Sequence, residues 1–321
     1  MLPWVTVGME LQPEGRNTME KTAGVRTRKP INWSDMTFSV VNYTLLTILL
    51  IITIYPFYYI FIYSISDSFQ AQSGVFLWPA GFSLESYRAT LQLNGLQEAA
   101  VVSVLRTIVG TILTVLFCSF FAYLITKREM PLRKLIYRFV LITMYFNAGF
   151  IPWYLTMKAY GLQNNFLLYV LPTALSGFNI ILIKTFIEQL PPALEESAKI
   201  DGAGYFTIFT RVIFPLSTPI IATIAVFAAL GQWNTWFDNF FLVENPNLQT
   251  LQLVLYNFLN QSNSISSMSA AEMTNSAEVR TMTPQSIQMT ITMLVTLPIV
   301  VVYPMLQRFF VKGIMMGAVK G

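Results

Sequence analysis

The sequence predicts an all-α, polytopic membrane protein with six transmembrane helices and with both ends of the chain in the cytoplasm. Three observations support this fold class: 54% of the 321 residues are hydrophobic, only 11% are charged, and the mean hydropathy is +0.55. A soluble domain carries about 25% charged residues, because its surface faces water. Continuous apolar runs also differ from the alternating ~10-residue strands of a transmembrane barrel, so helices are favoured.

Six apolar stretches come close to, or exceed, the ~20 residues that a helix needs to cross a ~30 Å hydrocarbon core. They are residues 36–66, 99–126 (interrupted by Arg106), 139–157, 159–183, 212–237 and 281–307. Six of the prolines within them are of interest, and each either kinks its helix or is simply tolerated there, as proline often is in membranes. These are Pro56, Pro172, Pro215, Pro219, Pro298 and Pro304.

Lysine and arginine lie mainly on one side of these predicted helices. Of 20 such residues, sixteen fall in the two terminal segments and in the loops 127–138 and 184–211, whereas only Arg88, Lys158 and Arg280 fall on the other side. Cytoplasmic loops retain such residues. We therefore expect cytoplasmic tails at 1–35 and 311–321 around a transmembrane domain at 36–310. The N-terminal segment lacks the features of a cleaved signal peptide.

The composition excludes several chemistries. The chain has no histidine and one cysteine, Cys118, so histidine bases, histidine metal sites and disulfides are ruled out. No Gly-Lys pair occurs, so the chain has no Walker-type phosphate loop. We expect no metal and no cofactor on this chain, and no nucleic acid as partner, because the net charge of +4 follows from the cytoplasmic loops. A nucleotide would bind another subunit.

The loop 184–211 predicts a short surface helix followed by a turn and a second helix. Pro192 suits a first helical turn, and Glu195 complements the positive end of the helix and can pair with Lys199 at i,i+4. Gly202, after Asp201, tolerates the positive φ of a helix stop. In the second helix, one apolar face is expected to consist of Phe206, Phe209 and Ile213.

This loop resembles the EAA loop of ATP-binding-cassette (ABC) importer permeases. The pattern Glu-Ala-Ala, three residues, Gly, nine residues, Ile, any residue, Leu-Pro is matched in spacing by 196–198, Gly202 and 212–215. Three positions depart from it at packing residues: Ser197, Val212 and Phe214. The run 201–203, Asp-Gly-Ala, is typical of the carbohydrate branch of the family.

Two further segments carry the resemblance. The C-terminal run 311–321 is similar to the end of the maltose-type permease subunit, and the segment 146–154 resembles a subgroup that handles complex oligosaccharides, including uronates such as alginate or pectin fragments. The resemblance implies a type I importer permease that forms the translocation pathway by alternating access. It also implies a bacterial cytoplasmic (inner) membrane location, with the lipid bilayer around the chain.

In this family the cytoplasmic bracket is a coupling helix seated in a cleft of the ATPase, and the motif glutamate faces a basic residue there. The residues to which the resemblance assigns ATPase coupling are Glu195, Glu196, Ser197, Ala198, Asp201, Gly202 and Ala203. Contact of the tail with the ATPase falls to Gly313, Gly317 and Lys320. The implied partners are a second homologous permease, two copies of the ATPase that binds ATP and magnesium, a solute-binding protein outside the cytoplasm, and an oligosaccharide.

Passage of a sugar requires hydroxyl-bonding groups and aromatic faces within the helices. The candidates are Tyr145, Asn147, Trp153, Asn179, Gln232, Trp233, Asn234 and Trp236. Each has a second interpretation, because Trp and Tyr near helix ends are commonly interfacial and buried amides often join helices. Arg106 lies about seven residues into its helix, so it is expected to reach the outer interface, with a role inside the bundle as the alternative.

Two questions of function stay open at this point. The polar outer loop 238–280 is either a solvated connector or a docking surface for an extracytoplasmic partner. A self-contained transporter driven by an ion gradient is the alternative to the ATP-driven importer, although only Arg106 is an ionisable residue within a predicted helix. An intramembrane enzyme would lack acid and base groups.

Overall fold

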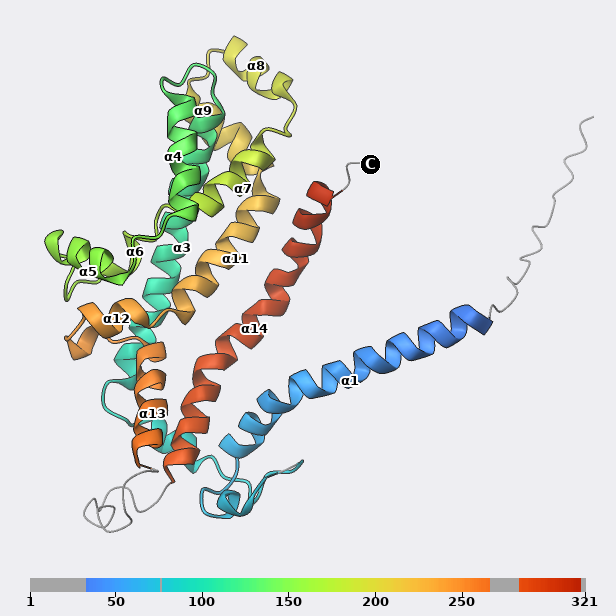
Figure 1. Ribbon diagram of the computed structural model, residues 1–321, viewed down its shortest axis with the longest axis vertical. Coiled ribbons are helices and arrows are strands. Elements are labelled where there is room, and N and C mark those ends of the chain that lie inside the picture. The colour runs from blue at the N-terminus through green and yellow to red at the C-terminus, as the bar shows by residue number, and fades with distance from the viewer. Residues whose placement is uncertain (1–32, 76, 266–282, 319–321) are drawn as a thin grey trace, which may run out of the picture. The chain divides into compact units, whose positions relative to one another are not determined.

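The computed structural model describes residues 33–75, 77–265 and 283–318, and within these ranges the regular elements are all helices, apart from one isolated β-bridge between Ser66 and Phe82. The longer helices are labelled in Figure 1. The α-helices are α1 (Trp33–Ser64), α2 (Glu85–Leu91), α3 (Leu96–Thr126), α4 (Arg133–Tyr145), α5 (Phe150–Ala159), α6 (Leu167–Val170), α7 (Gly177–Ile187), α8 (Pro192–Ile200), α9 (Tyr205–Ile208), α10 (Phe214–Leu216), α11 (Thr218–Asn234), α12 (Phe237–Leu242), α13 (Leu251–Ile265) and α14 (Pro284–Ala318). The shorter turns are 3₁₀-helices at Gln70–Ser73 and Pro246–Leu248, and a π-helical turn at Phe209–Ile213.

Three of the described helices are long and apolar enough to cross a membrane: the segments Met36–Ser64, Leu96–Thr126 and Pro284–Val302. A fourth crossing is formed if the segments Tyr205–Leu216 and Thr218–Asn234 are counted as one span, which is bent by 83°. Pro215 and Pro219 flank this bend, where each removes a backbone donor from the helix. The chain divides after Thr53 into two compact units, and the helices α2 to α14 all belong to the second.

The predictions of continuous helices at 139–157 and 159–183 are wrong. The first range is broken between α4 and α5, where the backbone N–H of Gly149 donates to Asn147 Oδ1 at 2.9 Å and Gly149 has φ +85°. The second is broken on both sides of α6, which is followed by Pro172. A side chain that bonds to the nearby backbone competes with the helix, and proline lacks the N–H group that a helix needs. The hydrophobicity of a stretch reveals neither effect. Figure 1 shows α5 turned crosswise to α4.

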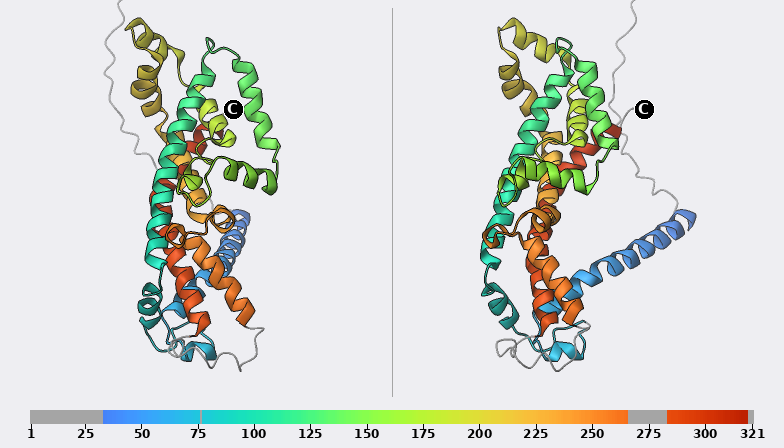
Figure 2. Two further views of the ribbon diagram at one scale, coloured as in Figure 1. Left: turned by 90° about the vertical axis from the view of Figure 1, so that its left-hand side faces the viewer. Right: turned by 60° about the vertical axis from the view of Figure 1, so that its left-hand side comes forward.

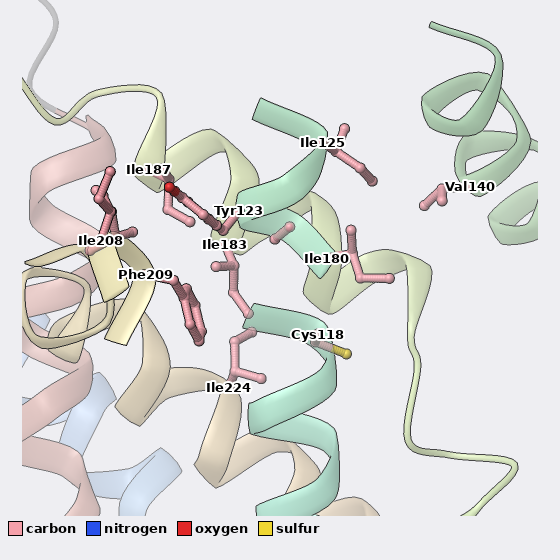
Figure 3. Close-up of a cluster of buried hydrophobic side chains, with 12 residues drawn as sticks. Cys118, Tyr123, Ile125, Val140, Ile180, Ile183, Ile187, Ile208, Phe209 and Ile224 are labelled. Atoms are coloured by element: carbon pink, nitrogen blue, oxygen red, sulfur yellow. The ribbon is translucent and has the colours of Figure 1, made fainter. Parts of the chain in front are cut away.

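The helix α3 packs along α11 and α7 through its small residues. A Cβ atom at Gly110 would lie 2.4 Å from Nε2 of Gln232, so glycine is what permits this close approach of α3 and α11. A buried apolar cluster fills the end of this bundle that carries α8, and Figure 3 shows Cys118 and Tyr123 of α3 in it, with Ile183, Phe209 and Ile224 among the side chains around them.

The outer loop 238–280 is not the connector that its polar sequence suggested, as far as the structure describes it. Its first residues belong to α12, and α13 follows after a short 3₁₀ turn. Leu242 and Val243 are buried in a second apolar cluster with Leu168, Tyr169 and Val170. Figure 2 shows α12 and α13 from two further directions. Residues 266–282, where a docking surface was also considered, lie outside the described residues.

Candidate functional site

The predicted surface helix at 184–211 is present as α8. Pro192 begins the helix, and Asp201 caps its end. The turn that follows is fixed by two backbone bonds: the N–H of Gly202 donates to Lys199 O at 3.0 Å, and that of Ala203 donates to Ala198 O at 3.0 Å. Gly202 has φ +80°, a conformation that residues with a Cβ rarely adopt. The prediction of a helix that stops at this glycine is confirmed.

The two adjacent glutamates of α8 lie in different surroundings. The Glu195 side chain is only 18% exposed to solvent, and it accepts a short hydrogen bond from Nζ of Lys127, which follows the last residue of α3. Lys199 Nζ lies 3.7 Å from Glu195 and 3.5 Å from Glu129, which extends the network. Glu196 is exposed and forms no ion pair within the described part of the chain. Glu195 therefore attaches α8 to α3, whereas Glu196 is free to meet a partner.

The titration of the two lysines reflects the same network. Burial lowers the pKa of Lys127 below its ordinary value, although the adjacent Glu195 carboxylate opposes that shift. Slight burial acts to lower the pKa of Lys199, but the nearby carboxylates of Glu129 and Glu195 outweigh it, so the pKa is raised above its ordinary value. The close carboxylate thus compensates only part of the cost of burying the Lys127 ammonium group, so the pair depends on both partners.

The second helix of the loop buries only part of the apolar face that was predicted for it. Phe209 and Ile213 are buried in the cluster of Figure 3, whereas 67% of Phe206 is exposed. The ring of Phe206 lies 6.0 Å from that of Phe120 in an edge-on arrangement. Phe209 and Ile213 stand at the two ends of the π-helical turn and are both buried, whereas Phe206 precedes that turn in the short helix α9.

A cavity of about 480 Å³ lies between α3, α7 and α11, and we call it the central cavity. Its walls combine hydroxyl, amide and apolar groups. It is lined by Arg106, Thr114, Pro172, Thr173, Leu175, Ser176, Asn179, Phe227, Ala228, Gly231, Gln232 and Thr235. Gln232 Nε2 donates to Thr173 Oγ1 at 2.7 Å, and Thr114 Oγ1 donates to Thr173 O at 3.1 Å. Such polar groups can form hydrogen bonds with a solute that is rich in hydroxyl groups.

Arg106 is buried at one end of this cavity, with 1% of its surface exposed. Its Nη1 and Nη2 donate to Asp238 at 3.1 and 2.5 Å, and its Nε donates to Gln232 Oε1 at 2.9 Å. Nη1 also donates to Thr235 O at 3.1 Å, and the guanidinium carbon lies 4.6 Å from the centre of the Tyr169 ring. This arrangement satisfies the cation from several helices at once.

The prediction that Arg106 reaches the outer interface is therefore wrong. Its alternative, a place inside the bundle, needed a partner, and the structure supplies Asp238, which the sequence placed at the start of a loop. Asp238 lies in the first turn of α12 and is buried. The bidentate pair joins α3 to the corner between α11 and α12, and its two charges cancel within the protein.

The candidate pathway residues fall into two groups. Asn179 and Gln232 line the central cavity. The other six do not line it: Tyr145, Asn147, Trp153, Trp233, Asn234 and Trp236. Tyr145 is 87% exposed, Trp233 Nε1 donates to Val295 O at 3.1 Å, and Trp236 stacks on Tyr256 at 4.0 Å.

The sequence did not predict the roles of Thr114, Thr173 and Asp238. Hydroxyl groups in apolar helices, and an aspartate beyond the end of a predicted helix, form no recognisable sequence pattern. Gly313 and Gly317 lie within α14, so the predicted tail continues that helix. Lys320 lies outside the described residues.

A Gly110→Ala substitution is expected to lower the stability of the protein. The new methyl group would press on Gln232, which Arg106 and Thr173 hold in place, and overpacking of this kind costs about 1–3 kcal/mol. Thermal unfolding in detergent measures the effect. Gly231→Ala is the matched control, because no atom lies within 4 Å of its added Cβ. A melting temperature of Gly110→Ala at or above that of the control would contradict the prediction.

The chain has close relatives among known proteins. Residues 114–316 match a family described as binding-protein-dependent transport system inner membrane component. The chain is 38% identical over 273 residues to Protein LplC of Bacillus subtilis (strain 168), covering 84% of this chain and 90% of that protein. It is 33% identical over 285 residues to the polygalacturonan/rhamnogalacturonan transport system permease protein YtcP of the same organism, covering 88% and 98%.

A solved structure is also similar over most of its length. It is described as the crystal structure of a bacterial ABC transporter involved in the import of the acidic polysaccharide alginate, and it superposes with a TM-score of 0.80 at 28% identity. The similarity covers 88% of this chain and 100% of that chain. The family match contains all of α8 and every residue of the central cavity except Arg106.

Proposed function

Because this chain belongs to the family of binding-protein-dependent transport system inner membrane components, we propose that it serves an importer of acidic oligosaccharides. Membership makes the chain an integral membrane subunit of an ABC importer, with the type I permease fold, and a transport component rather than an enzyme. Such a permease works with an ATPase and a binding protein.

The cargo is proposed from the relatives and from the cavity. One relative is named for polygalacturonan and rhamnogalacturonan transport, and the similar solved structure belongs to an importer of alginate. Both names refer to polymers of acidic sugars. In this chain the central cavity offers threonine hydroxyls and the amides of Asn179 and Gln232, which are groups that bind sugar hydroxyls. Oligosaccharide fragments rather than polymers fit a cavity of this size.

The proposed assembly places this chain beside a second homologous permease, on two copies of an ATPase that binds ATP and magnesium. An extracytoplasmic binding protein delivers the oligosaccharide, and the complex lies in the bacterial cytoplasmic membrane. The observation that carries the coupling role is the exposed Glu196 on α8, which forms no ion pair among the described residues and lies six residues before the positive-φ Gly202. An acidic group on a short helix that stops sharply suits a basic cleft on a partner.

The route of coupling follows from contacts of α8. When the ATPase closes and displaces α8, the Glu195–Lys127 pair passes the displacement to the end of α3. The helix α3 packs against α7 and α11, which form the other walls of the central cavity. The cavity alternates between two states, each open to one side of the membrane. To change the ratio of their populations from 1:99 to 99:1, a partner must bind one state about 5.5 kcal/mol more tightly than the other. A rigidly attached α8 can transmit that difference.

Uptake of labelled oligosaccharides tests the proposed cargo. Cells that lack this gene are expected to lose ATP-dependent uptake of oligogalacturonate or oligoalginate, and the restored gene is expected to recover it. Collapse of the proton and sodium gradients at constant ATP is expected to leave uptake intact, which distinguishes this importer from an ion-driven transporter. Normal uptake of both oligosaccharides without the gene would refute the cargo, and loss of uptake with the gradients would refute the ATP-driven mechanism.

A further inference from the structure

A basic groove of about 650 Å³ lies where α3 turns into α4, on the side of the chain that carries the predicted cytoplasmic loops. Five cationic side chains line it: Arg128, Arg133, Lys134, Arg138 and Lys184. It is separate from the central cavity and from the exposed face of α8, and the transport mechanism above makes no use of it.

The charge of the groove is poorly compensated by the protein. Glu188 is the one carboxylate paired with these cations in the described chain, with Lys184 Nζ at 2.7 Å and Arg133 Nη2 at 3.6 Å. Lys134 and Arg138 are exposed, form no ion pair within the described residues, and stand at i,i+4 on α4. Like charges at that spacing destabilise a helix. A bound anion would relieve this repulsion.

An apolar stripe begins at the same groove and continues along α4. Leu132, which caps the start of α4, and Leu135 belong to the groove itself, and Phe139 and Ile142 follow Leu135 on α4 at intervals of four and three residues. Between 61 and 71% of each of these four side chains is exposed. Residues at such intervals share one face of a helix, so the stripe leads from the cations into the predicted apolar layer.

We propose that the groove binds the phosphate of an anionic phospholipid whose acyl chains lie along the stripe Leu132, Leu135, Phe139 and Ile142. A phosphate diester on a glycerol backbone joins one negative group to two hydrocarbon chains. The structure presents the complementary pair in the same order, an uncompensated cationic groove followed by exposed apolar side chains. A free phosphate would use only the groove and would leave the stripe uncovered. Basic pockets on the cytoplasmic side of membrane helices commonly bind such lipids.

Native mass spectrometry of the full-length protein in detergent tests this proposal. Phosphatidylglycerol is expected to bind in a saturable manner, and phosphatidylcholine at least tenfold more weakly. The Lys134→Gln/Arg138→Gln variant is expected to weaken phosphatidylglycerol binding about 25-fold, since each cation near an anionic surface contributes roughly a fivefold factor. The matched control is Arg88→Gln/Arg211→Gln, which removes the same charge from two exposed positions outside the groove and is expected to bind normally.

Two further measurements separate a lipid from other occupants. Leu135→Gln/Phe139→Gln is expected to weaken phosphatidylglycerol binding while leaving any binding of glycerol 3-phosphate unchanged. Glycerol 3-phosphate at equal concentration is expected not to displace the lipid. Equal binding of phosphatidylcholine, normal binding by the double-cation variant, or displacement by glycerol 3-phosphate would each overturn the proposal. So would a photo-crosslinker at Leu135 that joins another protein chain in the assembled complex rather than lipid.

Discussion

Asp238→Ala is expected to lower the free energy of unfolding by about 3–5 kcal/mol, the range found when one partner of a buried ion pair is removed. The substitution leaves the Arg106 guanidinium buried, with Gln232 Oε1 and Thr235 O as its remaining acceptors. It also removes the link between α3 and α12 at the end of the central cavity. Unfolding of the purified protein in detergent, followed by far-ultraviolet circular dichroism, measures the loss.

A double-mutant cycle identifies the cause of that loss. Arg106→Met/Asp238→Leu removes both charges, so it is expected to recover most of the stability that either single change loses. Glu244→Ala serves as the control carboxylate, because it lies nearby in sequence and is exposed. If Asp238→Ala costs no more than Glu244→Ala, or if the double variant is as unstable as the sum of the single variants, the pair does not hold the helices together.

The sequence could not predict this pair, and the reason is physical. Arg106 was expected near the outer interface because it lies close to one end of an apolar stretch, and a long side chain ordinarily reaches water from there. Its acceptor is 132 residues away, in a six-residue helix that follows a stretch ending in polar and aromatic residues. A contact of such sequence separation depends on the packing of α3 against α11, which no local pattern encodes.

The α8 loop could be predicted in more detail because its determinants are local. Pro192 at the helix start and Gly202 at its stop act through backbone geometry within a few residues. The breaks near Gly149 and Pro172 are local too, but they lie inside apolar stretches that also satisfy the length of a transmembrane helix. Hydrophobicity outweighed the turn signals there, so two predicted helices were too long.

Glu196→Lys is expected to reduce ATP-dependent uptake at least tenfold while leaving the fold unchanged. The side chain is exposed and has no ion pair among the described residues, so its loss costs the isolated protein little. A reversed charge would instead repel a basic cleft on the ATPase. Uptake by cells and the melting temperature of the purified variant are measured in parallel. Gly202→Asp is also expected to reduce uptake, because a side chain at the φ of +80° strains the turn that ends α8.

Glu195→Gln provides the comparison within the same helix turn. It removes the carboxylate bound to the buried Lys127, so it is expected to lower the melting temperature as well as uptake. The two neighbouring glutamates thus separate coupling from stability. If Glu196→Lys destabilised the protein as much as Glu195→Gln, or if it retained normal uptake, the assigned division between the two residues would be wrong.

The most direct test of the account is to identify what touches α8. A photo-crosslinking amino acid in place of the exposed Ser197, in the complex within intact membranes, is expected to form its main adduct with the ATPase subunit. The same group in place of the exposed Asn245, at the start of the 3₁₀ turn that follows α12, is expected to form none with it. An adduct of Ser197 with the binding protein, or no adduct with the ATPase, would contradict the claim that α8 receives the work of ATP hydrolysis.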